Sequence, residues 1–207
     1  MTDAAHRITT EAELVALYGE PGEASVVKEV GHVHPIYRPF IEAAPFCVLA
    51  TAGPGGLDAS PRGDGPGFVV VEDEHTLLIP DRRGNNRVDS LRNVIADPRV
   101  ALLFLIPGVG ETIRVNGRAH LSVDPALKAR FAVDGKEPRS ILVVAVERVF
   151  FQCSRAVVRA ALWNADAQVA RSALPSVGTI LAAVSAARVG GDDYDRTLPE
   201  RVKATLY

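Results

Sequence analysis

The segment FCVLATAGPGGLDASP, residues 46–61, contains the pattern that decides the fold of this chain. Residues 46–51 form an apolar run of strand length, and residues 57–61 continue as a second extended segment. The connection between them, Gly-Pro-Gly-Gly at residues 53–56, consists of residues that favour a tight turn. Two strands around a turn of this kind predict a β-hairpin.

The hairpin pattern recurs along the chain, and helical patterns lie between the hairpins. Further strands are expected at residues 68–72, 76–80, 100–106, 112–121 and 140–153. Helices are expected at residues 8–18, 35–44, 86–97, 125–131, 155–163 and 176–188. This order predicts a mainly β fold with helices, built on an antiparallel barrel. A Rossmann fold is disfavoured, because no Gly-x-Gly-x-x-Gly opens a helix and no Walker A motif occurs.

Composition restricts the class of protein. The chain has 207 residues, of which 47% are hydrophobic and 23% charged, and these values suit one sizeable globular domain with short appendages. A net charge of -2 gives no reason to expect a general affinity for nucleic acid or for anionic membranes. The longest apolar run, residues 100–106, is too short for a membrane span, and no signal peptide is visible. We therefore expect a cytoplasmic protein.

Cysteine, histidine and tryptophan give little sign of chemistry when each is taken alone. Cys47 and Cys153 have no Cys-x-x-Cys partner, so we expect two buried small hydrophobic residues. His32 and His34 form a His-x-His pair without a recognisable third ligand, which favours a solvated pair over a metal site. Trp163 near the end of a predicted helix is, by itself, more typical of a core residue than of a cofactor contact.

Three polar stretches, residues 60–67, 80–87 and 111–118, place arginine and asparagine beside glycine or proline. Arginine has a planar fork that matches phosphate oxygens, and free N–H groups at a helix start also attract anions. Each stretch has an ordinary structural explanation: Asn85 could cap a helix, and Arg114 could be a surface charge. Together the three stretches favour a phosphate site.

In combination, these motifs resemble the pyridoxamine 5′-phosphate oxidase class of FMN-binding proteins. The resemblance covers roughly residues 35–165 and rests on residues 60–64, 66–68, 79–82, 84–87, 90–93, 114–119 and 162–163. It implies a split β-barrel and a homodimer with FMN in its interface, where each flavin touches both chains. The domain organisation expected from it is a helical N-terminal appendage at 1–34, the barrel at 35–165, and a helical C-terminal tail at 166–207 that docks elsewhere.

The resemblance also implies a set of cofactor-binding residues. They are Ala59, Ser60, Arg62, Ile79, Pro80, Asn86, Arg87, Thr112, Arg114 and Trp163. In this assignment Arg62 and Arg87 face the phosphate, Asn86 and Ser60 donate hydrogen bonds, and Arg114 lies near the polar end of the flavin ring. The segment containing Trp163 closes the site from the other chain.

The leading functional hypothesis is an FMN-dependent oxidoreductase with an unidentified small substrate and NAD(P)H as a candidate electron donor. Residues 164–187 are rich in alanine and lack the basic segment with which B6 oxidases grip their substrate, so the resemblance does not extend to that substrate. The sequence identifies no residue as a catalytic acid or base. The alternatives are a deazaflavin or haem on the same fold, a flavin-storage or sensing module, and a barrel without a ligand. For haem, the candidate axial ligands are His32, His34 and His120, besides the cysteines and Met1.

Overall fold

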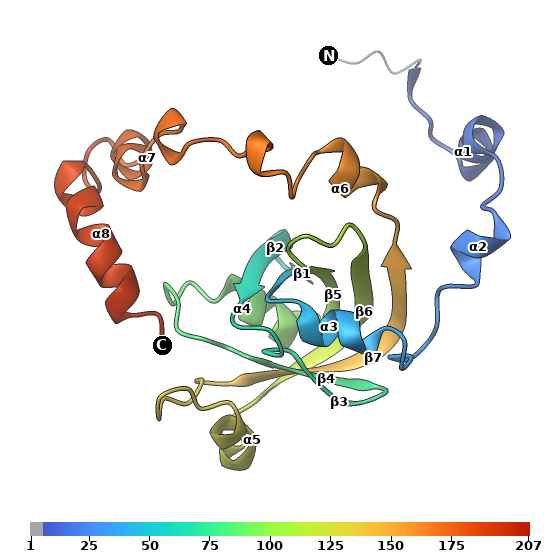
Figure 1. The fold of residues 1–207 in the computed structure, drawn as a ribbon, viewed down its shortest axis with the longest axis horizontal. Coiled ribbons are helices and arrows are strands. Elements are labelled where there is room, and N and C mark those ends of the chain that lie inside the picture. The colour runs from blue at the N-terminus through green and yellow to red at the C-terminus, as the bar shows by residue number, and fades with distance from the viewer. Residues whose placement is uncertain (1–5) are drawn as a thin grey trace.

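The computed structural model describes residues 6–207 and contains a seven-stranded, fully antiparallel sheet that curls around its main core (Figure 1). The strands are β1 (Phe46–Gly53), β2 (Gly56–Gly63), β3 (Val70–Asp73), β4 (Thr76–Pro80), β5 (Arg99–Leu105), β6 (Thr112–Ser122) and β7 (Ile141–Gln152). Their order in the sheet is β2-β1-β5-β6-β7-β4-β3. The sheet is open, because its edge strands β2 and β3 do not pair with each other, and the fold is a split β-barrel with helices.

The expected hairpins are confirmed by the strand register. β1 pairs with β2 around the turn at 53–56, so that Leu49 lies opposite Ser60, and β3–β4 and β5–β6 pair likewise. β6 and β7 form the longest ladder, which shifts register between Asn116 and Gly117. A side chain at Gly117 would approach the Ala145 carbonyl oxygen to 2.2 Å, which explains the need for glycine at this bulge.

The six predicted helices are present with the same or shorter bounds, and α2 (Glu23–Val26) and α8 (Asp192–Ala204) are helices that the sequence pattern did not predict. The predicted six are α1 (Glu11–Tyr18), α3 (Arg38–Ala43), α4 (Asp89–Ala96), α5 (Pro125–Arg130), α6 (Arg155–Arg159) and α7 (Val177–Val184). Thr10 caps α1 in a reciprocal capping box with Glu13, as expected. α4 begins later than expected because Asn86 and Val88 have left-handed backbone angles that a helix does not allow.

The core lies on the inner face of the sheet and is built from alternate strand residues. Cys47 and Leu49 of β1 face Leu102 and Phe104 of β5, and all four side chains are fully or almost fully buried. Burial raises the pKa of the Cys47 thiol to about 12, so this group stays protonated. The prediction that Cys153 is also buried was wrong: β7 ends one residue earlier, and the chain leaves the sheet with the thiol exposed.

Two arms project from the barrel (Figure 1). The N-terminal arm contains α1 and α2, neither of which has a buried residue, and the first five residues of the expected 1–34 appendage lie outside the described residues. The C-terminal arm runs from α6 through two short 3-10 turns to α7 and α8, which pack against each other. Among residues 6–207, no helix is long and apolar enough to cross a membrane.

Candidate functional site

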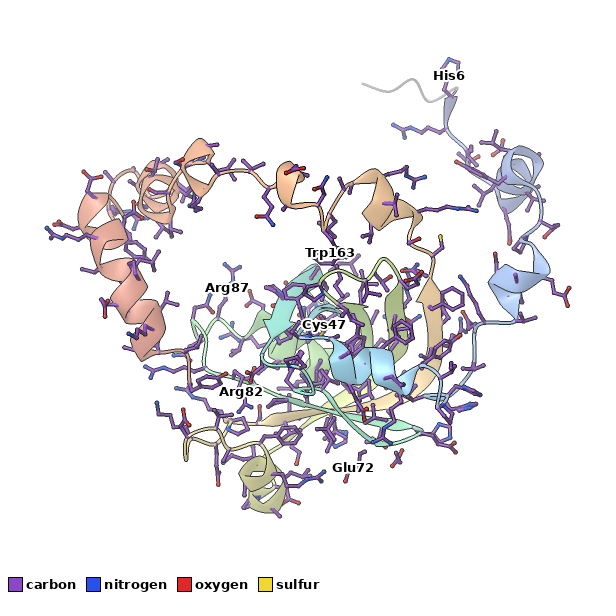
Figure 2. The ribbon with its side chains drawn as sticks, in the orientation of Figure 1. His6, Cys47, Glu72, Arg82, Arg87 and Trp163 are labelled. Atoms are coloured by element: carbon purple, nitrogen blue, oxygen red, sulfur yellow. The ribbon has the colours of Figure 1, made fainter. Side chains whose placement is uncertain are left out.

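An open cavity of about 440 Å³ lies along the edge strand β2, between this strand, the end of β4 and the start of α4. Figure 2 labels two residues of its lining, Arg82 and Arg87. The cavity is lined by residues 58–63, Phe68, residues 80–91 and Arg139. Two of the three polar stretches singled out in the sequence therefore meet at one place.

Strand alternation explains the β2 side of the cavity. Asp58, Ser60 and Arg62 are each partly buried, while the residues between them are exposed. The Arg62 guanidinium donates from Nη1 to Ser60 Oγ at 2.6 Å and to the Pro61 carbonyl oxygen at 2.9 Å. These bonds hold the guanidinium in place before any ligand arrives.

The opposite wall is the loop between β4 and α4, and its backbone is strained. Asn86 and Val88 have φ angles of 61° and 50°. A β-branched residue such as valine rarely adopts this conformation, which costs about 1–3 kcal/mol and is concentrated at functional sites. Val88 caps α4 without a side-chain hydrogen bond, so the first N–H groups of the helix remain available to a ligand.

Two asparagines stabilise this loop. Asn85 Oδ1 accepts a hydrogen bond of 3.0 Å from the Arg87 N–H, and Asn86 Oδ1 accepts one of 2.9 Å from Arg139 Nη1. Asn85 therefore forms a turn and does not cap the helix. Arg139 precedes β7, and it reaches the cavity because β7 pairs with β4, with Ile141 opposite Pro80.

The charged side chains of the cavity differ in whether they already have partners within the protein. The lining contains five arginines and three aspartates, which favours a negatively charged ligand. The Arg87 side chain is 79% exposed and forms an ion pair with Asp89, so part of its charge is already neutralised. Asp58 accepts a hydrogen bond of 2.7 Å from the buried Ser90 hydroxyl, which fastens α4 to β2. Burial raises the pKa of Asp81, against the effect of the nearby Arg62 and Arg139 charges.

The structure brings together six of the predicted site residues. Those lining the cavity are Ala59, Ser60, Arg62, Pro80, Asn86 and Arg87. Ile79 lies next to Pro80 on β4 but is buried in the core. Asp81 lies in one of the three polar stretches but was not predicted as a site residue. Arg139 was not found, because a strand pairing that joins distant segments leaves no local signal in the sequence.

The other three predicted residues lie elsewhere in the chain. Thr112 and Arg114 are on β6 and do not line the cavity, and the Arg114 guanidinium lies 5.3 Å from the centre of the Phe150 ring. Trp163 is partly exposed, beyond the end of α6, and its Nε1–H donates to the Val109 carbonyl oxygen at 2.7 Å. This hydrogen bond ties the start of the C-terminal arm to the β5–β6 hairpin.

The residues present fit a phosphorylated flavin. The cavity has the size of typical small-molecule sites, its guanidinium groups match phosphate oxygens, and its asparagines and backbone offer both donors and acceptors. Haem fits less well, because His32, His34 and His120 do not contribute to the lining. Within residues 6–207, no group of His, Cys, Asp and Glu side chains is arranged to hold a metal ion.

Fold and site together define a split-barrel protein with an arginine-rich cavity at its open edge. A family model described as pyridoxamine 5′-phosphate oxidase matches residues 33–153, which is more than half of the chain. The protein therefore belongs to the pyridoxamine 5′-phosphate oxidase family.

Several solved structures are similar to this chain at low sequence identity. A variant of HupZ from Group A Streptococcus shares 16% identity, with a TM-score of 0.48 over 58% of this chain and 99% of its own. General Stress Protein 26 from Bacillus anthracis shares 17% identity, with a TM-score of 0.40 over 55% and 88%. An FAD binding protein from Mycobacterium smegmatis shares 15% identity, with a TM-score of 0.41 over 59% and 97%. Among curated proteins, none matches this sequence.

Proposed function

We propose that this protein is a cytoplasmic, FMN-dependent oxidoreductase that acts on a small substrate and works as a homodimer. The observation that supports this most directly is the preset Arg62 guanidinium in an arginine-rich cavity at the open edge of the barrel. Membership in the pyridoxamine 5′-phosphate oxidase family and the name of the FAD binding protein above are consistent with a flavin at this place.

The chain contributes binding and orientation. Arg62 and the available N–H groups at the start of α4 bind the phosphate, and Arg139 keeps Asn86 in position through its hydrogen bond. Arg62 is held by its own strand, so little conformational entropy is lost when it meets the phosphate. When bound, FMN supplies the hydride and electron-transfer chemistry, which no side chain can provide.

A homodimer would explain the predicted residues that lie outside the cavity. Thr112 and Arg114 are partly buried residues on the outer side of β6, since the alternating residues Ile113 and Val115 point into the core. On β5 the corresponding outer positions include Leu103 and Leu105, which are only partly buried. We propose that this face meets the cavity of a second copy, so that each flavin is bound by both chains.

The first test compares FMN with riboflavin, which lacks the phosphate, in fluorescence titrations of the apoprotein. A phosphate contact predicts binding of FMN at least about tenfold tighter, the minimum for one charge-assisted hydrogen bond. Equal affinities for the two flavins, or no binding of either, would contradict the proposed site. A dilution series followed by light scattering tests the shared site: flavin release and dimer dissociation should coincide, and a flavin-bound monomer refutes it.

Turnover is tested separately from binding. The FMN-loaded protein is mixed anaerobically with NADH or NADPH, and flavin absorbance is followed before and after oxygen is admitted. Reduction followed by reoxidation supports an oxidoreductase. If no donor reduces the bound flavin, the storage or sensing alternative replaces the enzyme hypothesis.

A further inference from the structure

The C-terminal arm returns to the barrel at Tyr207, beside the candidate flavin cavity. The Tyr207 hydroxyl donates a hydrogen bond of 2.6 Å to Asp64 Oδ1, on the segment that follows β2. The Tyr207 ring lies 5.7 Å from the Arg82 guanidinium, at the start of the loop between β4 and α4. One side chain therefore contacts both segments that border the cavity.

Asp64 and Arg82 form a well-buried ion pair, with side chains only 10% and 17% exposed and a separation of 2.7 Å. Desolvation alone would raise the pKa of Asp64, but hydrogen bonds from Tyr207, the Gly65 N–H and Arg82 outweigh it, and the net shift is downward. Because the pair is shielded from solvent, losing one of its hydrogen bonds costs more than at an exposed site.

Arg82 connects this pair to the cavity wall. Its Nη1 donates to the Phe131 carbonyl oxygen at 2.6 Å, so Asp64 and Phe131 together hold the guanidinium in place. The neighbouring residue Asp81 and the strained loop at 82–88 line the flavin cavity directly. Fixing Arg82 therefore fixes the point at which this loop leaves β4.

Tyr207 also forms part of a second cavity of about 170 Å³. This cavity shares Asp81, Arg82, Arg83 and Arg139 with the flavin cavity, so the two adjoin. Within the C-terminal arm, which ends at Tyr207, hydrogen bonds join α8 to the start of α7. Asp195 of α8 accepts hydrogen bonds from the Ser176 hydroxyl and from the Gly178 N–H.

We propose that Tyr207 is a positioning residue of the flavin site, which holds the loop at 82–88 in its ligand-binding conformation through Asp64 and Arg82. The flavin part of this inference rests on the proposed function, whereas the ordering of the loop does not. The prediction is that removing one hydroxyl group at the end of the C-terminal arm weakens a ligand that this group does not touch.

The test uses full-length Tyr207→Phe, which keeps the ring over Arg82 and removes only the hydroxyl. The matched control is Tyr194→Phe, a tyrosine of α8 whose ring also lies over an arginine, Arg201, at 4.2 Å. Two quantities are measured: amide hydrogen exchange of residues 82–88 without ligand, and the Kd for FMN. Tyr207→Phe should speed exchange in this loop and raise the Kd about three- to tenfold, while the control changes neither.

Each outcome decides one part of the inference. Unchanged exchange in Tyr207→Phe overturns the proposal that Tyr207 orders the loop. Faster exchange with an unchanged Kd shows a purely structural contact and overturns the positioning role. If the wild-type protein fails to bind FMN, the proposed function fails, and the exchange measurement still decides whether Tyr207 holds the loop.

Discussion

Replacing Arg62 by alanine tests the proposed phosphate contact at a residue whose guanidinium is already held in place by hydrogen bonds within β2. The guanidinium is partly buried and held by Ser60 Oγ and the Pro61 carbonyl oxygen, so its hydrogen bond to a phosphate gains from reduced screening and needs little further ordering. A hydrogen bond to a charged group contributes about 1.5–3 kcal/mol, which corresponds to a Kd for FMN that rises roughly ten- to hundredfold. Arg87, exposed and paired with Asp89, should give a smaller loss, about two- to fivefold.

The assay is the fluorescence titration with FMN and riboflavin, and Arg99→Ala is the matched control. Arg99, at the start of β5, is 71% exposed, forms an ion pair with Asp97 and does not line the cavity. Arg62→Ala should weaken FMN and leave riboflavin within about twofold, because the lost contact is to the phosphate. A loss of both flavins to the same degree would show that Arg62 shapes the cavity and does not bind phosphate.

Three further outcomes follow from the structure. Asp89→Asn should tighten FMN binding about two- to fivefold in the same titration, because it removes a negative charge at the start of α4 and frees Arg87 from its ion pair. Weaker binding would show that Asp89 itself contributes to FMN binding. Gly117→Ala should lower the free energy of unfolding by about 2–4 kcal/mol in urea, whereas Gly55→Ala, with no atom near its Cβ, should change it by less than about 0.5. The pKa of Asp64 is lowered in the folded protein, so its carboxylate stabilises the fold above about pH 4, and this stabilisation is lost as the pH falls through the lowered pKa. Asp64→Asn should therefore reduce the fall in the urea midpoint between about pH 6 and pH 3. An unchanged fall would refute this.

The fold was largely predictable because hairpins are local. The turn at 53–56 and the apolar run before it indicate the pairing of β1 with β2 without information from elsewhere in the chain. Helix starts were less predictable where backbone strain intervenes: the pattern places the start of a helix at Asn86, but the left-handed Val88 delays it. Burial of Cys153 was mispredicted because the strand pattern continues by one residue past the last ladder pair.

The candidate site was predictable only in part. Residues 60–67 and 80–87 could be singled out, since arginine and asparagine stand beside glycine or proline there. Arg139 could not, because it reaches the cavity through the pairing of β4 with β7, more than fifty residues apart. The arrival of Tyr207 at Asp64 had only a weak signal, an apolar end to a polar tail, and the pattern did not indicate where it docks.

The central claim, that the cavity binds FMN, is tested most directly by the absorption spectrum of the purified protein and the mass of the chromophore released from it. The account predicts a flavin spectrum and the mass of FMN, with loss of the colour in Arg62→Ala after dialysis. A colourless wild-type protein that also fails to bind added FMN would contradict the account, as would a released chromophore that carries no phosphate.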